Sequence, residues 1–152
     1  LFITFKYTAT IKVDGELCMD ENCIFCKIAQ KQIPSNVVYE DDDFFAFLDI
    51  RPCANGHTLV ITKHHYKHML DVPPAIQEKY MTVVSSVAKK LAKATGRADC
   101  TILTRCGHSS GQEVDHVHVH IVPSSDDEPV TFGHNHMEYD QDALMKQLRD
   151  EV

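Results

Sequence analysis

The chain of 152 residues carries 15 lysines and arginines against 22 aspartates and glutamates, which gives a net charge of −7. This acidic balance argues against a protein that binds duplex nucleic acid, because such proteins usually present a basic face. Hydrophobic residues make up 43% of the chain, too many for a disordered protein, and no apolar run approaches the ~20 residues that span a bilayer. The length suits one domain with a real core.

The N-terminal region, residues 1–20, is taken as an extension of unknown role. It lacks the charged start, the long apolar core and the small-residue cleavage site of a secretory signal. The polar residues 20–22 then suit the start of a helix. We expect a short helix from about Cys23 to Lys31 that ends before Pro34.

The middle of the chain alternates short apolar runs with one long helical stretch. Pro73-Pro74 and an apolar stripe at helical spacing predict a long helix to about Ala94, with Gly96 as its stop. A shorter charged helix is expected at residues 140–149. Strand-like runs bounded by turn signals predict five strands: 37–40 and 44–48 as a hairpin, 57–61, 101–104, and a fifth that begins at His116. The pattern predicts an α+β domain at 21–125 with a largely antiparallel sheet, followed by a tail at 126–152.

The fifth strand reads His116-Val117-His118-Val119-His120. Alternate side chains on a strand share a face, so three imidazoles should line one side while the valines are buried on the other. Three interpretations compete: an exposed histidine-rich face, a metal site, or a division of labour in which one histidine attacks and another handles a proton or a phosphate oxygen. Residues four apart on a strand lie roughly 13 Å apart, so one metal could take two of these histidines, not all three.

A polar loop, Gly107–Val114, precedes this strand and contains two glycines. Such a loop can turn successive backbone N–H groups toward an anion. An anion-binding loop beside a potential nucleophile favours phosphoryl chemistry.

Two of the six cysteines form a Cys-x-x-Cys pair, Cys23 and Cys26. In an intracellular protein this spacing indicates zinc or redox chemistry, although the redox interpretation wants a thioredoxin-like βαβ context that the sequence does not offer. A zinc site needs two more ligands, and His64, His65, His68 and the histidine row are candidates. Two ordinary reduced cysteines are the alternative.

Several segments together carry a resemblance to a known family. They are the histidine row preceded by Gly111–Val114, and, in chain order, residues 23–28, 33–35, 39–41, 46–50, 56–61 and 63–65. Over residues 21–125 the chain resembles the histidine triad (HIT) superfamily, and most of all its Hint branch of nucleoside phosphoramidases. The resemblance implies a HIT-like fold and an adenosine 5′-monophosphoramidase-like hydrolase, which cleaves the P–N bond of an AMP-amide and acts on a purine nucleotide.

The resemblance also implies roles for individual residues. His118 would attack the α-phosphorus to form a nucleotidyl-histidine, His120 would touch the phosphate and assist protonation of the amine, and His57 would be the fourth histidine of the site. Without the family, His57 is a turn histidine and the apolar residues of the expected base slot are core. The remaining expected contacts are Gln112, Glu113 and Val114 with the phosphate, Asp49 with the ribose, and Ile33, Phe47, Ile50 and Phe25 with the base.

For the metal, the resemblance implies a structural zinc ion bound by Cys23, Cys26, His65 and His116, with no part in catalysis. Two positions depart from the family pattern. Arg105 stands where members commonly carry Asn or Gln, and an arginine there binds phosphate bidentately or points to solvent. Glu113 stands where some members have serine, and its carboxylate would repel a phosphate unless it points away.

Two rival functions remain open at this stage. One is hydrolysis of a dinucleoside polyphosphate, and the other is a zinc-stabilised interaction module with weak activity. From the resemblance we further expect a homodimer whose sheet continues across the two-fold axis. We expect the protein in the cytoplasm, with the nucleus as a second location.

Overall fold

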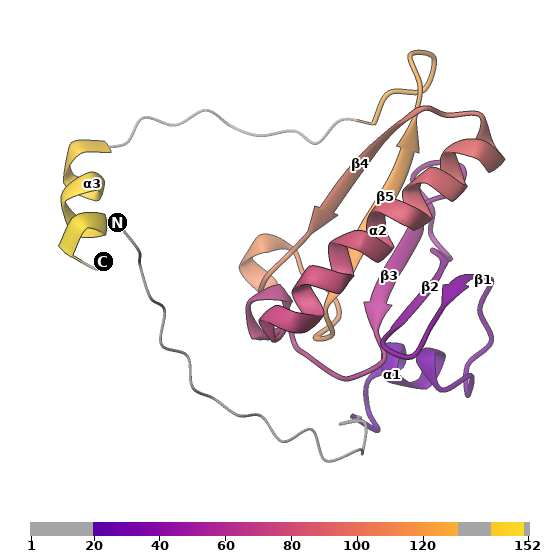
Figure 1. Cartoon of the computed structure of the whole chain (residues 1–152), viewed down its shortest axis with the longest axis horizontal. Coiled ribbons are helices and arrows are strands. Elements are labelled where there is room, and N and C mark those ends of the chain that lie inside the picture. Colours follow the sequence, from indigo (N-terminus) through magenta and orange to yellow (C-terminus); the bar gives the residue numbers. More distant parts are fainter. Residues whose placement is uncertain (1–19, 131–140, 151–152) are drawn as a thin grey trace.

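The computed structural model describes residues 20–130 and 141–150, whose strands form one antiparallel sheet in the order β1-β2-β3-β5-β4 (Figure 1). The predicted α+β class, with five antiparallel strands, is confirmed. None of the described helices is long and apolar enough to cross a membrane. The elements are α1 (Ile24–Ala29), β1 (Val37–Glu40), β2 (Phe44–Leu48), β3 (Thr58–Thr62), η1 (Met69–Asp71), α2 (Pro74–Thr95), β4 (Asp99–Thr104), η2 (His108–Ser110), β5 (His118–Ser124) and α3 (Gln141–Asp150).

The long helix α2 lies across one face of the sheet (Figure 1). It begins at Pro74, whose ring suits the first helical position, and ends at Gly96, whose φ of 70° favours glycine. The fully buried Tyr80 donates its hydroxyl hydrogen to the Val60 carbonyl at 2.6 Å, which ties the helix to a central strand. The core on this face consists chiefly of Phe44, Ala46, Val60, Tyr80, Val83, Val84, Val87, Leu91, Val117, Val119 and Ile121.

The opposite face of the sheet is covered by α1, through a second cluster that includes Phe25, Ile28, Phe45, Phe47, Leu59 and Ile61. Cross-strand partners share a face of the sheet. His118 pairs with Ile61 and His120 pairs with Leu59, so both histidines point to the α1 side. The predicted alternation along the histidine row is confirmed, because Val117, Val119 and Ile121 pack against α2 instead.

Three predicted strand starts are wrong. β4 begins at Asp99, two residues earlier than predicted, and the other two corrections each move a histidine out of a strand. β5 begins at His118, because the N–H groups of His116 and Val117 donate to the carbonyls of Val114 and Tyr66, outside the strand ladder. β3 begins at Thr58, and His57 closes the preceding turn through a bond to Ala54. The short helix also ends earlier than predicted, at Ala29.

Candidate active site and metal cluster

The nucleophile candidate, His118, is held in one tautomer by the backbone. Its Nδ1 lies 2.7 Å from the carbonyl oxygen of His116. Because a carbonyl only accepts, Nδ1 must carry the hydrogen, which leaves Nε2 with a lone pair for a ligand. Burial lowers the pKa of His118. The hydrogen bond to the His116 carbonyl opposes this shift, Arg105 adds to it, and Asp49 and Glu113 oppose it. The ring is therefore neutral near pH 7 and able to attack an electrophile.

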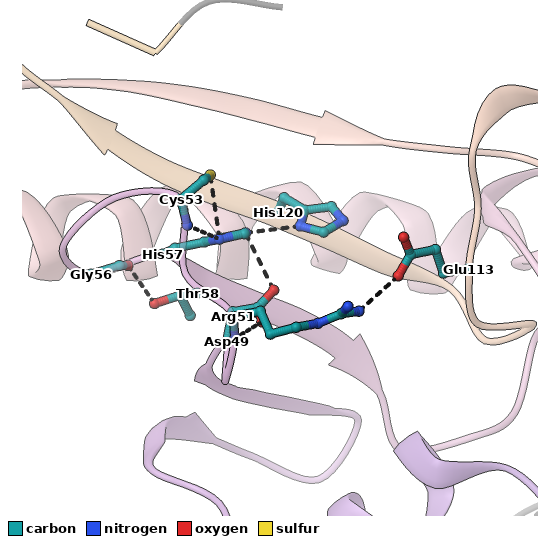
Figure 2. A network of polar contacts seen from close by, with 8 residues as sticks. All are labelled: Asp49, Arg51, Cys53, Gly56, His57, Thr58, Glu113 and His120. Atoms are coloured by element: carbon teal, nitrogen blue, oxygen red, sulfur yellow. Dashed lines mark hydrogen bonds and ion pairs between the residues drawn. The ribbon is translucent and has the colours of Figure 1, made fainter. Parts of the chain in front are cut away.

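A second pair of rings, His57 and His120, forms what we call the histidine relay (Figure 2). The Cys53 backbone N–H donates to Nδ1 of His57 at 3.3 Å, so Nε2 of His57 carries the hydrogen. That hydrogen is donated to Nδ1 of His120 across 2.9 Å, which leaves the Nε2–H of His120 to serve the site. The Asp49 carboxylate lies 3.7 Å from Nε2 of His57. Burial and the neighbouring histidines lower the pKa of His120 to about 4.

A cleft of about 470 Å³ lies beside these histidines. The edge of the Phe25 ring contacts His118, with ring centroids 5.2 Å apart, and Ile50 is 90% exposed at the rim. Of the residues expected to hold the base, Ile33 is absent from the lining and packs against the core cluster around α1. The lining comprises Ile24, Phe25, Ile28, Phe47, Asp49, Ile50, Arg51, Leu59, Arg105, Gly111, Glu113, Val114, His118 and His120.

The loop before β5 is held together by Gln112, which is 2% exposed. Its side-chain oxygen accepts the Gly107 N–H at 2.7 Å, and its amide nitrogen donates to the carbonyls of Lys67 and Val114. Both amide hydrogens are thus engaged with the backbone. In this structure Gln112 shapes the loop and is absent from the cleft lining.

The four ligands expected for a metal lie together, and we call them the metal cluster: Cys23, Cys26, His65 and His116. Their ligand atoms all lie within 4.8 Å of one another. Nδ1 of His116 is 3.4 Å from the Cys23 sulfur and 3.5 Å from the Cys26 sulfur, and Nδ1 of His65 is 3.3 Å from the Cys26 sulfur. Zinc bond lengths of about 2.0–2.3 Å at tetrahedral angles require nitrogen–sulfur separations of roughly 3.5 Å.

The hydrogen bonds around the metal cluster leave a ring nitrogen of His116 free to bind a cation. Nε2 of His116 donates to the Thr62 carbonyl at 2.8 Å, so Nδ1 keeps its lone pair for the cluster. Burial raises the pKa of the Cys26 thiol to about 11, and a nearby cation is what would favour the thiolate. The other candidates, His64 and His68, lie outside the cluster, and His68 instead faces Asp71 at 3.1 Å.

Comparisons with known proteins agree with this geometry. The family model described as "HIT domain" matches residues 30–127. The chain belongs to the HIT family. Adenosine 5′-monophosphoramidase HNT1 of Saccharomyces cerevisiae is 38% identical to it over 145 residues, 95% of this chain and 89% of the relative. Adenylylsulfatase HINT3 of Arabidopsis thaliana is 34% identical over 105 residues, 69% of this chain and 53% of the relative.

Solved structures agree with the same assignment. The crystal structure of SMU.412c from Streptococcus mutans is 32% identical, has a TM-score of 0.79, and is matched over 99% of this chain and 97% of the other. A HIT family protein from Bacillus anthracis is 31% identical with a TM-score of 0.74, over 87% of this chain and 98% of the other.

Within this HIT domain, Arg105 and Glu113, the two departures from the family pattern, both line the cleft. Arg105 donates to the Gly111 carbonyl at 3.2 Å, while Glu113 forms an ion pair with Arg51 at 3.1 Å (Figure 2). Sequence reasoning missed Arg51, although its position directly after Asp49-Ile50 was a usable signal. It also missed Cys53, whose backbone N–H donates to Nδ1 of His57 and whose sulfur lies 3.6 Å from the same nitrogen.

Proposed function

We propose that this HIT family hydrolase cleaves the P–N bond of nucleoside 5′-phosphoramidates of the AMP-amide type, releasing AMP and an amine. The observation that carries the proposal is the tautomer of His118, which leaves the Nε2 lone pair available beside the cleft. A neutral imidazole in a fixed orientation suits attack on phosphorus. The yeast relative named adenosine 5′-monophosphoramidase supports the same reaction.

In the first step, Nε2 of His118 bonds to the α-phosphorus as the P–N bond breaks, and the departing nitrogen takes a proton from His120. The histidine relay must therefore carry one extra proton before this step, so that the pair of rings is cationic. Burial disfavours that extra proton, whereas Asp49 raises the pKa of both relay histidines and the substrate's phosphate acts in the same direction. The bound substrate thus helps to charge the acid that its cleavage requires.

In the second step, water attacks the phosphorus and the bond to His118 breaks. The water leaves its hydroxyl on AMP and returns one proton to the relay, so His118 and the relay regain their starting states. Two displacements through a covalent intermediate replace one difficult displacement.

The cleft lining supports a nucleoside site. Phe25 and Phe47 pack edge to face with ring centroids 5.7 Å apart and offer an apolar wall of the cleft for a purine, and Ile50 offers a rim contact. Among the described residues, one Asp49 oxygen accepts the Arg51 N–H at 2.8 Å and the other faces Nε2 of His57 at 3.7 Å, so the carboxylate retains acceptor capacity for ribose hydroxyls. Ile33 then supports the apolar wall indirectly, because it packs against the core cluster that contains Phe25 and Phe47.

The test compares three substrates, AMP-amide, a dinucleoside polyphosphate and adenylyl sulfate, by separate measurement of AMP release from each. Adenylyl sulfate is the second candidate substrate, because the Arabidopsis relative is named an adenylylsulfatase. We expect the highest kcat/KM for AMP-amide, and an AMP adduct on the peptide that contains His118 after rapid quenching. AMP release from either competitor with none from the amide would overturn the proposal.

For the metal cluster we propose a structural zinc ion bound by Cys23, Cys26, His65 and His116. Two sulfurs and two nitrogens at tetrahedral separations support a closed site, and bound zinc there would supply folding energy without taking part in the reaction. Protein purified without chelator should contain about one zinc per chain.

We also propose a homodimer in which the sheet continues across the two-fold axis. The observation in favour is that β4 forms an edge of the sheet and leaves Ile102 42% exposed. Light scattering of the purified protein should give twice the chain mass, and Ile102→Lys should return it to the monomer mass.

A further inference from the structure

An ion pair spans two segments at the cleft, and the proposed reaction does not use it. The guanidinium of Arg51 lies 3.1 Å from the Glu113 carboxylate. Figure 2 shows Arg51, from the segment after β2, reaching toward Glu113, from the segment before β5, and draws His120 near this pair. Both residues line the cleft, and their side chains are 80% and 74% exposed. A ligand in the cleft therefore meets both charges.

An ion pair this exposed contributes little to stability, because water competes for both partners. It can open readily when another charged group arrives. Among the described hydrogen bonds and ion pairs, the side chains of Arg51 and Glu113 bond only to each other. The backbone N–H of Arg51 separately donates to Asp49. The pair is thus better suited to meeting a ligand than to holding the fold together.

The charges in the cleft lining decide what kind of ligand group is favoured there. Asp49 and Glu113 are negative and Arg51 and Arg105 are positive, so the four cancel. A substrate phosphate carries its own negative charge, and Arg105 is the guanidinium that no carboxylate holds among the described ion pairs. Once Arg105 serves the phosphate, Asp49, Glu113 and Arg51 together carry one net negative charge, which the extra proton of the histidine relay offsets until that proton passes to the leaving nitrogen.

We propose that Glu113 selects the leaving group by charge and that it favours phosphoramidates whose amine carries a second, cationic centre, such as a diamine. This inference rests on the proposed function. A leaving group with a negative charge is repelled by the Glu113 carboxylate and should give the lowest kcat/KM. A neutral leaving group should give an intermediate value. Arg51 acts as a positioning residue, because it holds the Glu113 carboxylate at the cleft and weakens its field.

Three AMP-amides test this selection with little change at the reacting nitrogen: those of 1,4-diaminobutane, butylamine and 4-aminobutyrate. Their distal charges are positive, neutral and negative. Unit charges about 4 Å apart in water change an equilibrium about fivefold, so kcat/KM should fall about fivefold at each step along that series. Added salt should compress the series, because both charges are exposed.

Variants separate Glu113 from the overall charge of the protein. Glu113→Gln should abolish or invert the preference, since it removes the carboxylate and leaves Arg51 unpaired. Arg51→Gln should widen the preference, since Glu113 then acts alone. Asp115→Asn is the matched control: it removes one negative charge from the same loop, but Asp115 faces Lys67 and His108 and is absent from the cleft lining. Its ratio of kcat/KM values should equal that of the native enzyme.

Equal kcat/KM for the three amides in the native enzyme, or an unchanged ratio in both Glu113→Gln and Arg51→Gln, overturns the inference while the proposed function survives. Failure of all three amides and of AMP-amide itself to release AMP overturns the proposed function, and the inference with it. Thermal melts of each variant show whether it is folded. Glu113→Gln and Arg51→Gln change exposed side chains, and each gives an independent measurement of the ratio of kcat/KM values.

Discussion

His116 and His118 stand two positions apart on one chain segment, yet the structure fixes them in opposite tautomers. His116 donates from Nε2 to the Thr62 carbonyl, and its Nδ1 faces two cysteine sulfurs. His118 donates from Nδ1 to the His116 carbonyl, and its Nε2 is left for the cleft. One histidine is fully buried among ligands, whereas the other borders a cavity. A backbone carbonyl therefore decides, in each case, which nitrogen is available and for what.

The largest effect is expected from substituting the ring that borders the cleft. His118→Asn should lower kcat for AMP-amide at least about a thousandfold, because the covalent route is lost. Its melting temperature and metal content should stay close to those of the native protein. A variant that keeps more than a few per cent of native kcat would show that His118 is not the nucleophile.

The metal cluster should respond in the opposite way. Cys23→Ser should lower metal content and cut the free energy of unfolding by about 3 kcal/mol, because metal binding is coupled to folding. Its kcat at moderate temperature should change much less than its stability. Calorimetry beside metal analysis makes the measurement, and native melting behaviour in metal-free protein would refute the zinc proposal.

The histidine relay should have an effect on rate below that of the nucleophile. His57→Gln should lower kcat about a hundredfold, within the usual range for general acid catalysis, and change KM little. Cys53→Ala is the matched control, because alanine keeps the backbone N–H that orients His57. If Cys53→Ala lowers kcat as far as His57→Gln does, the thiol itself takes part and the relay is drawn wrongly.

The nucleoside end of the cleft should show a smaller effect. The 2′-deoxy form of AMP-amide should lose about tenfold in kcat/KM, because an unpaired acceptor on Asp49 costs about 1–3 kcal/mol. Asp49→Ala should erase most of that discrimination, although Asp49 also lies near His57 and the variant will be slower on both substrates. Equal kcat/KM for ribo and deoxy substrates in the native enzyme would exclude Asp49 as the ribose ligand.

Acid stability provides the smallest test. Burial lowers the pKa of His120 from 6.5 to about 4. Between pH 4 and pH 6.5, His120 therefore binds a proton in the unfolded chain but not in the folded protein. Stability should accordingly be complete above pH 6.5 and fall as the pH drops toward 4. In urea titrations at pH 7 and pH 5, the native enzyme should lose more stability than His120→Asn. An equal loss in the two proteins would place His120 in a solvated environment.

The orientation of a side chain also matters for two other residues that the sequence analysis placed in the site. Gln112 was expected at the phosphate, yet both its amide hydrogens bond backbone carbonyls, one of them on Lys67 in a distant segment. Ile33 was expected at the base, and its side chain packs against the core cluster around α1. The orientation of both side chains depends on partners that no local pattern identifies.

The sequence by itself determined the features that depend on local periodicity and local chemistry. Alternation placed His118 and His120 on one face, turn signals and Pro73-Pro74 marked the elements, and Cys-x-x-Cys supplied half of a metal cluster. Only the tertiary structure decided which ring nitrogen of His118 is available and that Arg51 meets Glu113, and it brings His65, which the family resemblance had singled out, to the two cysteines. These outcomes depend on contacts between segments far apart in sequence, whose geometry no local pattern contains.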